Sequence, residues 1–105
     1  MLVNSQTPHP QRVFYALASL PRRQIIAFLS QTALSTAELA ERFRMSRPAI
    51  SRHLSVLQRA GLIAGERQGQ RVLYRLRRDE LLGALGHFAL EVDGALQYKN
   101  PRDAI

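Results

Sequence analysis

The chain contains no cysteine, which excludes disulfides, thiolate metal sites and thiol redox switches. It has no apolar run long enough to cross a bilayer. The opening segment MLVNSQTPHP lacks the basic stretch followed by an apolar stretch that marks a signal peptide. Together these absences predict a soluble cytoplasmic protein without covalent cross-links.

Acidic residues are few compared with basic ones. The 105 residues include 8 Asp plus Glu against 15 Lys plus Arg, a net charge of +7, and the pI is about 11.3. Such a balance predicts an acidic partner, with nucleic acid first and an anionic membrane surface second. Most of the basic residues are arginines between Arg42 and Arg78, and the guanidinium fork suits phosphate and guanine, so nucleic acid is favoured. A hydrophobic fraction of 46% in a chain of this length predicts one globular domain.

Two helices are expected in the first third of the chain. Pro8 and Pro10 lie among polar residues, so residues 1–11 are predicted to form an arm outside the core. A first helix starts near Arg12, and a second spans residues 21–31 with a proline in its first turn. Apolar residues recur at helical spacing in both, namely Val13, Phe14, Ala16, Leu17 and Leu20, then Ile25, Ile26 and Leu29.

Residues 35–62 have the pattern of two short helices joined by a tight turn. Ser35 is an N-cap, and Glu38 three residues later completes a capping box. Arg44 and Met45 form the turn, although a turn residue with positive φ is more often glycine or asparagine. The segment is therefore predicted to be a helix-turn-helix.

The second of these helices presents a small, basic outer face. Ser46 caps it, and Gly61 ends it in the left-handed conformation that suits glycine. At the helical period Ile50, Leu54 and Leu57 fall on one face, and Pro48, Arg52, Ser55 and Arg59 fall on the opposite one. Such a face fits the major groove of DNA, where residues near the helix N-terminus reach base edges. The leading contact candidates are Ser46, Arg47, Ser51 and Arg52, with Ser55 on the same face.

Two short strands are expected at residues 62–67 and 71–77, around a turn that contains Gly69. In the second strand Val72, Tyr74 and Leu76 alternate with Arg71, Arg75 and Arg77. A hairpin with arginine on its exposed edge is a β-wing, which lies against the DNA backbone or the minor groove. The predicted wing contacts are Arg67, Gln70 and Arg71.

Asp79 is predicted to cap a last helix with an apolar stripe from Leu81 to Val92, which Leu96 extends. The stripe either closes the core of the monomer or packs against a second copy, and its place at the chain end favours a homodimer. The predicted dimer interface consists of Val13, Phe14, Leu17, Leu81, Leu85, Phe88 and Val92.

The predicted fold is mainly α with a small β-hairpin, a winged helix-turn-helix at residues 12–98 followed by a tail at 99–105. The segments MSRPAISRHLSVLQRAGLI and ERQGQRVLYRL resemble the ArsR family of bacterial winged-helix repressors, including its SdpR-like members. The resemblance covers roughly residues 12–92. It implies a homodimeric repressor bound to an imperfect inverted repeat, with recognition helices in adjacent major grooves about 34 Å apart.

The resemblance carries over residue by residue. Gly69 with Arg71 matches the wing tip of the family, and its DNA-reading surface is matched by Ser46, Arg47, Pro48, Ser51 and Arg52. The family commonly has glutamine where this chain has Arg47. The additional guanidinium either alters base preference or adds a phosphate contact.

The usual sensing residues of the family are missing. Members that respond to arsenite or soft metals use cysteines on the third helix, where this chain has none between Thr36 and Ala40. Zinc sensors use Asp and His on the last helix, where this chain offers only Asp79, Glu80, His87, Glu91 and Asp93. One histidine among carboxylates suits zinc poorly, so no metal or other cofactor is expected. Release from DNA would then depend on a protein partner, an unidentified small molecule or the abundance of the protein itself.

Other polar residues are expected to have structural roles. His53 lies beside the buried edge of its helix and is predicted to be a hydrogen-bonded packing residue. Arg22 and Arg23 are expected on the exposed side of the second helix, and Arg77 and Arg78 form either a solvated strand end or a phosphate clamp.

No motif of nucleophile, base and orienting group surrounds any of the three histidines, so an enzyme is disfavoured. The rival to DNA binding is a winged-helix protein-protein interaction module whose basic face serves only solubility.

Overall fold

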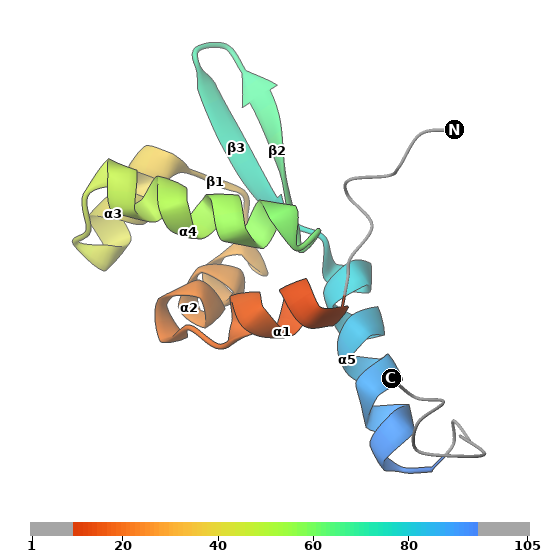
Figure 1. Cartoon of the computed structure of the whole chain (residues 1–105). Coiled ribbons are helices and arrows are strands. Elements are labelled where there is room, and N and C mark those ends of the chain that lie inside the picture. Colours follow the sequence, from red (N-terminus) through yellow and green to blue (C-terminus); the bar gives the residue numbers. More distant parts are fainter. Residues whose placement is uncertain (1–9, 95–105) are drawn as a thin grey trace.

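The structure, a computed structural model, describes residues 10–94 as a bundle of helices with a small sheet (Figure 1). Its helices are α1 (Pro10–Leu17), α2 (Leu20–Leu29), α3 (Thr36–Phe43), α4 (Arg47–Arg59) and α5 (Arg78–Val92). Its strands are β1 (Leu34–Ser35), β2 (Ile63–Gln68) and β3 (Arg71–Leu76). The predicted tail, Leu96 and most of the predicted arm lie outside the described residues. This order of elements confirms a winged helix-turn-helix.

The core lies where α1 to α4 meet the base of the sheet. The residues predicted to face inward on α2 and α4 are all buried. The largest side chains with almost no exposed surface are Val13, Ile25, Leu39, Ile50, Leu54, Leu57, Leu62 and Ile63. Because every one of these is aliphatic, the hydrophobic effect holds α4 against the other helices along its whole length.

The helix-turn-helix forms as predicted. Ser35 Oγ accepts a hydrogen bond from the Glu38 N–H at 3.2 Å, and Glu38 Oε1 accepts one from the Ser35 N–H at 2.8 Å. This capping box starts α3. Arg44 ends it in the left-handed region at φ 53° and ψ 40°, and Gly61 follows α4 at φ 79°. The turn therefore uses an arginine where glycine would be less strained.

The sheet has one strand more than predicted. Its order is β1-β3-β2, with both pairs antiparallel, and Leu34 of β1 lies opposite Tyr74 of β3. β1 has only 2 residues, too few for an alternating pattern to reveal it in the sequence. Its pairing covers the edge of β3 away from β2. Leu73 is buried although it lies on the same face of β3 as Arg71 and Arg75.

The two end helices differ from the prediction at their starts. α1 begins at Pro10 instead of Arg12, because proline is well suited to the first turn of a helix. The prediction that Asp79 caps α5 is wrong, since the N-cap is Arg77 and its side chain makes no capping hydrogen bond. Asp79 lies instead in the first turn, where a negative charge still stabilises the helix dipole.

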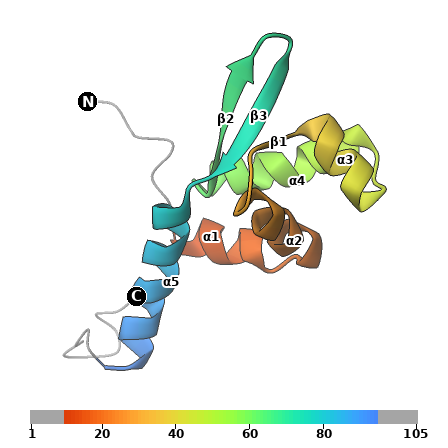
Figure 2. The same cartoon turned by 180° about the vertical axis from the view of Figure 1, so that it is seen from behind.

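α5 runs away from the other helices, in the direction opposite to the β2-β3 hairpin (Figures 1 and 2). None of its described residues is buried. Leu81 and Ala84 pack against the core, whereas Phe88 is 50% exposed and Val92 73% exposed. The apolar stripe of α5 therefore does not close the core of the monomer.

Candidate nucleic-acid interface

The exposed side of α4 carries most of the residues predicted to contact DNA. Burial of Ile50, Leu54 and Leu57 sets the rotation of the helix about its axis. As a result the opposite side is accessible, with Ser55 half-buried and Arg47, Pro48, Ser51 and Arg52 exposed. The side chains on this face are small or basic, and none of them is acidic.

Ser46 positions the N-terminal end of this helix. Its Oγ accepts a hydrogen bond from the Ala49 N–H at 3.2 Å, and Pro48 fills the first turn without leaving a donor unpaired. The other N–H groups of the first turn lie at the positive end of the helix dipole. Helix N-termini of this kind bind phosphate through their backbone N–H groups. α4 therefore offers side chains that can contact base edges and a helix end that can bind a phosphate.

The hairpin of β2 and β3 extends past α4 on the side away from α1 and α2 (Figures 1 and 2). Gly69 adopts φ 65° in its turn, a conformation that favours glycine. Arg67, Gln70 and Arg71 are exposed next to this turn, as expected of a wing tip. The structure thus places two separate basic surfaces on the chain, one on α4 and one on the wing.

A carboxylate that the sequence analysis did not connect with the wing lies beside Arg71. Glu38 Oε1 is 3.8 Å from Arg71 Nη1, with both side chains largely in solvent. Hydrogen bonds from the backbone and side chain of Ser35 lower the pKa of Glu38, and the charges of Arg71 and Arg42 lower it further. The capping carboxylate of α3 therefore stays ionised and pairs with the arginine next to the wing tip, although the exposed ion pair itself contributes little stability.

The expectation that Arg22 lies on the exposed side of α2 is wrong. Its Nε donates to the Ala16 carbonyl at 2.8 Å and its Nη2 to the Tyr15 carbonyl at 3.1 Å. Its Nη1 lies 3.4 Å from His53 Nδ1. The predicted packing role of His53 is confirmed, because this half-buried ring has a partner within the fold.

Arg77 and Arg78 contact distant carbonyl groups of the same chain. Arg77 Nη1 donates to the Gly61 carbonyl at 3.0 Å, and Arg78 Nη2 donates to the Ser30 carbonyl at 2.8 Å. Arg77 also pairs with Glu80 at 3.3 Å. Arg77 is half-buried and not a solvated strand end, whereas Arg78 is exposed. Both fasten the start of α5 to the rest of the fold.

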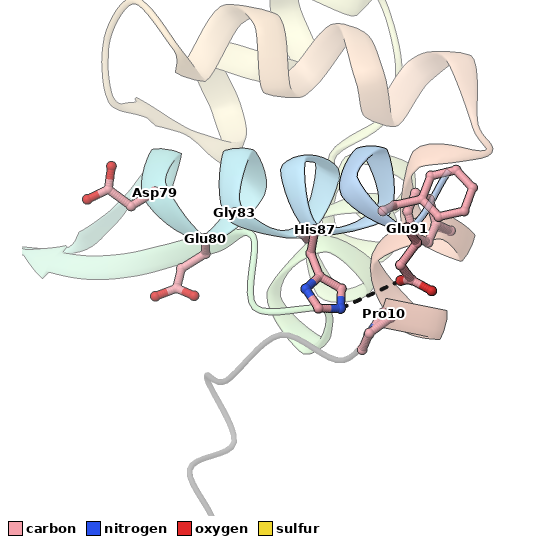
Figure 3. A pocket seen from close by; sticks show the side chains of 9 residues that line it. Pro10, Asp79, Glu80, Gly83, His87 and Glu91 are labelled. Atoms are coloured by element: carbon pink, nitrogen blue, oxygen red, sulfur yellow. Dashed lines mark ion pairs between the residues drawn. The ribbon is translucent and has the colours of Figure 1, made fainter. Parts of the chain in front are cut away.

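The possible zinc ligands on α5 do not converge. Pro10, Phe14 and one side of α5 from Asp79 to Glu91 line a cavity of about 320 Å³. Figure 3 shows that Asp79 and Glu80 point away from the other candidates. In that view His87 points toward Glu91, and Nε2 and Oε1 are 3.6 Å apart. Within residues 10–94, no three acidic or histidine side chains gather closely enough to hold a metal ion.

The residues predicted to form a dimer interface fall into two groups. Val13 has no exposed surface and belongs to the core of the monomer, so its assignment to the interface is wrong. Leu17 and Leu81 are half-buried against that core. Phe14 packs edge to face on Phe88 at 5.2 Å between ring centroids, and these two rings, Leu85 and Val92 remain accessible on the outside.

Within residues 10–94, no helix is both long and apolar enough to span a membrane. A capped helix-turn-helix, an exposed basic helix and an arginine-bearing hairpin define the class of the protein. It is a winged helix-turn-helix protein of the DNA-binding type.

Comparison with known proteins narrows this class. Residues 21–64 match the family model described as bacterial regulatory protein, arsR family. The chain is 38% identical over 64 residues to the transcriptional repressor SdpR of Bacillus subtilis, which covers 61% of this chain and 71% of SdpR. Across the related regulators compared, the aligned part covers 53% to 71% of the relative.

Solved structures agree with the sequence relatives. A crystal structure of an ArsR family transcriptional regulator superposes with a TM-score of 0.73 at 25% identity, covering 90% of this chain and 99% of the other. A homodimeric winged helix-turn-helix DNA-binding domain from Mycobacterium bovis gives a TM-score of 0.66 at 27% identity, covering 86% and 83% of the two chains. The chain belongs to the ArsR family. It is a DNA-binding transcriptional regulator and not an enzyme.

Proposed function

We propose that the protein is a homodimeric repressor that binds an imperfect inverted repeat in DNA. The observation that carries this proposal is the exposed, acid-free face of α4 next to a wing that ends in arginines. In this arrangement α4 lies in the major groove, and the wing lies on the backbone or in the minor groove. The similarity to SdpR, a transcriptional repressor, supports the repressor role.

The contacts divide between reading and positioning. Arg47, Ser51 and Arg52 stand near the N-terminal end of α4, where side chains reach base edges. Ser46, Pro48 and Ser55 shape and flank this surface, while Arg67, Gln70 and Arg71 hold the backbone beside it. Sequence preference then comes from α4, and the wing adds affinity that does not depend on sequence.

The dimer is proposed to form through α1 and α5. An apolar helix without buried residues needs a partner surface to remain stable in water. Phe14, Leu85, Phe88 and Val92 supply that surface, and Leu17 and Leu81 support it from the core. A C2 dimer built this way presents two α4 helices to the two half-sites of an inverted repeat.

The signal that releases the protein from DNA is proposed to be a protein partner, a small molecule or a change in the abundance of the protein. A thiolate metal site is impossible because the chain has no cysteine. As a DNA-binding regulator the protein is proposed to act in the cytoplasm.

The proposal is tested by measuring binding to the DNA upstream of the protein's own gene over a series of salt concentrations. For a dimer that uses several phosphate contacts, the logarithm of the binding constant falls steeply with the logarithm of the salt concentration, with a slope of about 0.9 in magnitude for each phosphate neutralised. Random DNA of equal length serves as the control for sequence preference. A flat slope without preferred sequence would instead identify an interaction module for another protein.

A further inference from the structure

A second basic groove lies between the C-terminal half of α4, β2 and the start of α1. Its volume is about 420 Å³, and its walls include Arg12, Ser55, Gln58 and Arg59. A neighbouring hollow of about 260 Å³ is also lined by Arg12 and Arg59. The two guanidinium groups therefore come from helices far apart in the sequence and line the same concave surface.

These two arginines have no partner among residues 10–94. No hydrogen bond, ion pair or ring contact joins either side chain to another described residue, whereas Arg22, Arg77 and Arg78 all donate to backbone carbonyls. Both are also exposed. Two cations held close together without a counterion repel one another, and an anion bound between them would relieve the repulsion.

Arg59 is not needed to satisfy the C-terminal end of α4. The Gln58 carbonyl accepts from the Gly61 N–H at 3.0 Å, and the Leu57 carbonyl accepts from the Leu62 N–H at 3.0 Å. The Gly61 carbonyl is taken by Arg77. The guanidinium of Arg59 is therefore available to a ligand from outside the chain.

The groove continues the DNA-facing side of α4. Arg52, Ser55 and Arg59 follow one another at steps of three and four residues, so they share one side of the helix. Arg59 lies about 10 Å further along the axis than Arg52, at a rise of about 1.5 Å per residue. A recognition helix that reads bases at its N-terminal end meets the backbone at the edge of the groove with its C-terminal end.

We propose that Arg12 and Arg59 form a phosphate clamp that binds one phosphodiester of the DNA backbone beside the major groove. The clamp rests on the proposed function, because α4 must lie in the groove for the phosphate to reach it. Ser55 and Gln58 add neutral donors on the same wall. The clamp reads no base, so it strengthens binding to cognate and random DNA alike.

The clamp is tested with Arg12→Gln and Arg59→Gln in the full chain, by measuring the salt dependence of binding to cognate and random DNA. We expect each substitution to lower the slope by about 0.9 per phosphate, hence by roughly 2 for the two clamps of a homodimer. The double variant should lose less affinity than the product of the two single factors, since both side chains hold one group. Arg23→Gln, which removes the same charge outside the groove, is the matched control.

Three outcomes would overturn the clamp. The first is that both groove variants have the same salt dependence of DNA binding as Arg23→Gln, while the unaltered protein still binds its operator more tightly than random DNA. The second uses operators in which one phosphate at a time is replaced by a neutral methylphosphonate. The clamp is overturned if no such replacement lowers the affinity of the unaltered protein more than it lowers the affinity of the Arg12→Gln variant. The third is saturable binding of inorganic phosphate without DNA together with an unchanged slope, which would assign the groove to a free anion. If the unaltered protein showed no preference between operator and random DNA, the proposed function itself would be rejected. Thermal melting of each variant verifies that it is folded.

Discussion

Arg22 joins the ring of His53, in the recognition helix α4, to the C-terminal end of α1. One guanidinium contacts His53 Nδ1 at 3.4 Å, the Ala16 carbonyl at 2.8 Å and the Tyr15 carbonyl at 3.1 Å. It also lies over the ring of Tyr15, 5.3 Å from the centroid. Because arginine only donates, Nδ1 accepts and the neutral ring carries its proton on Nε2. The orientation of α4 against α1 thus depends on a histidine that is neutral.

Acidification should destabilise the fold through His53. Burial, followed by the charges of Arg22 and Arg52, lowers the pKa of His53 below 6.5 in the folded state. The unfolded chain then binds more protons than the folded chain as the pH falls through 6.5, so stability decreases toward acid and is constant above that range. Urea unfolding between pH 8 and pH 5 measures this effect, which is limited to about 1.4 kcal/mol per pH unit for one proton.

His53→Gln should flatten this part of the pH dependence, since glutamine retains an acceptor for Arg22 but does not titrate. His87→Gln, on the exposed side of α5, is the matched histidine control and should leave the dependence in place. An identical pH profile for the unaltered protein and His53→Gln would contradict the role given to this ring.

Replacing Arg22 should cost more stability than replacing its neighbour Arg23. Arg22→Ala removes the donor to the Ala16 carbonyl and to His53 Nδ1, while the Tyr15 carbonyl keeps only the Ala18 N–H, and we expect a loss of about 1 to 3 kcal/mol. Arg23 makes one exposed hydrogen bond, to the Leu17 carbonyl at 2.6 Å, so Arg23→Ala should cost about 1 kcal/mol or less. Chemical denaturation of both variants provides the comparison, and equal losses would show that Arg22 does not bridge the helices in solution.

The two basic surfaces should respond differently to substitution. Arg52→Ala should cost about 1 to 3 kcal/mol mainly on the cognate site, because it removes a side chain from the reading end of α4. Arg71→Ala should weaken binding to all sequences alike and lower the salt slope by about one unit per wing. Titrations with cognate and random DNA separate the two effects. Equal losses on both DNAs for Arg52→Ala would restrict that residue to the backbone.

The α5 stripe should control the oligomeric state. Leu85 is 39% exposed beside Phe88, and Leu85→Asp would place a charge in the proposed interface. We expect monomers at micromolar concentration by sedimentation velocity, where the unaltered protein is a dimer. Leu20→Asp, at a position 57% exposed on α2, is the control and should leave the dimer intact. An unchanged sedimentation profile for Leu85→Asp would rule out this interface.

Gly65 should be required for the packing of the wing. A Cβ at this position would lie 2.9 Å from Val72 Cγ1 and 3.1 Å from Tyr74 Cε1, closer than the packed hairpin allows. We expect Gly65→Ala to destabilise the fold by about 1 kcal/mol, as overpacking does elsewhere. Gly86→Ala meets nothing within 4 Å and should stabilise α5 by up to about 1 kcal/mol. Thermal melting of both variants tests the opposite signs.

Much of the fold was predictable because its signals are local. The Ser35 capping box, the Ser46 cap and the glycine after α4 each act within a few residues, and all three occur as predicted. Asp79 failed as a cap because Arg77 is tied to the Gly61 carbonyl, and α5 begins directly after it. The short strand β1 was not predicted, because only its pairing with β3, a distant segment, defines it as a strand.

The sequence by itself determined the order of the helices and of the wing, the rotation of α4 and the absence of thiolate chemistry, since these follow from caps, helical period and composition. Only the tertiary structure decided the role of each arginine. A guanidinium presents five donors, and the carbonyls or charges that meet them belong to distant segments, such as Ser30 for Arg78. Packing therefore turned Arg22, Arg77 and Arg78 into internal links and left Arg12 and Arg59 facing an open groove.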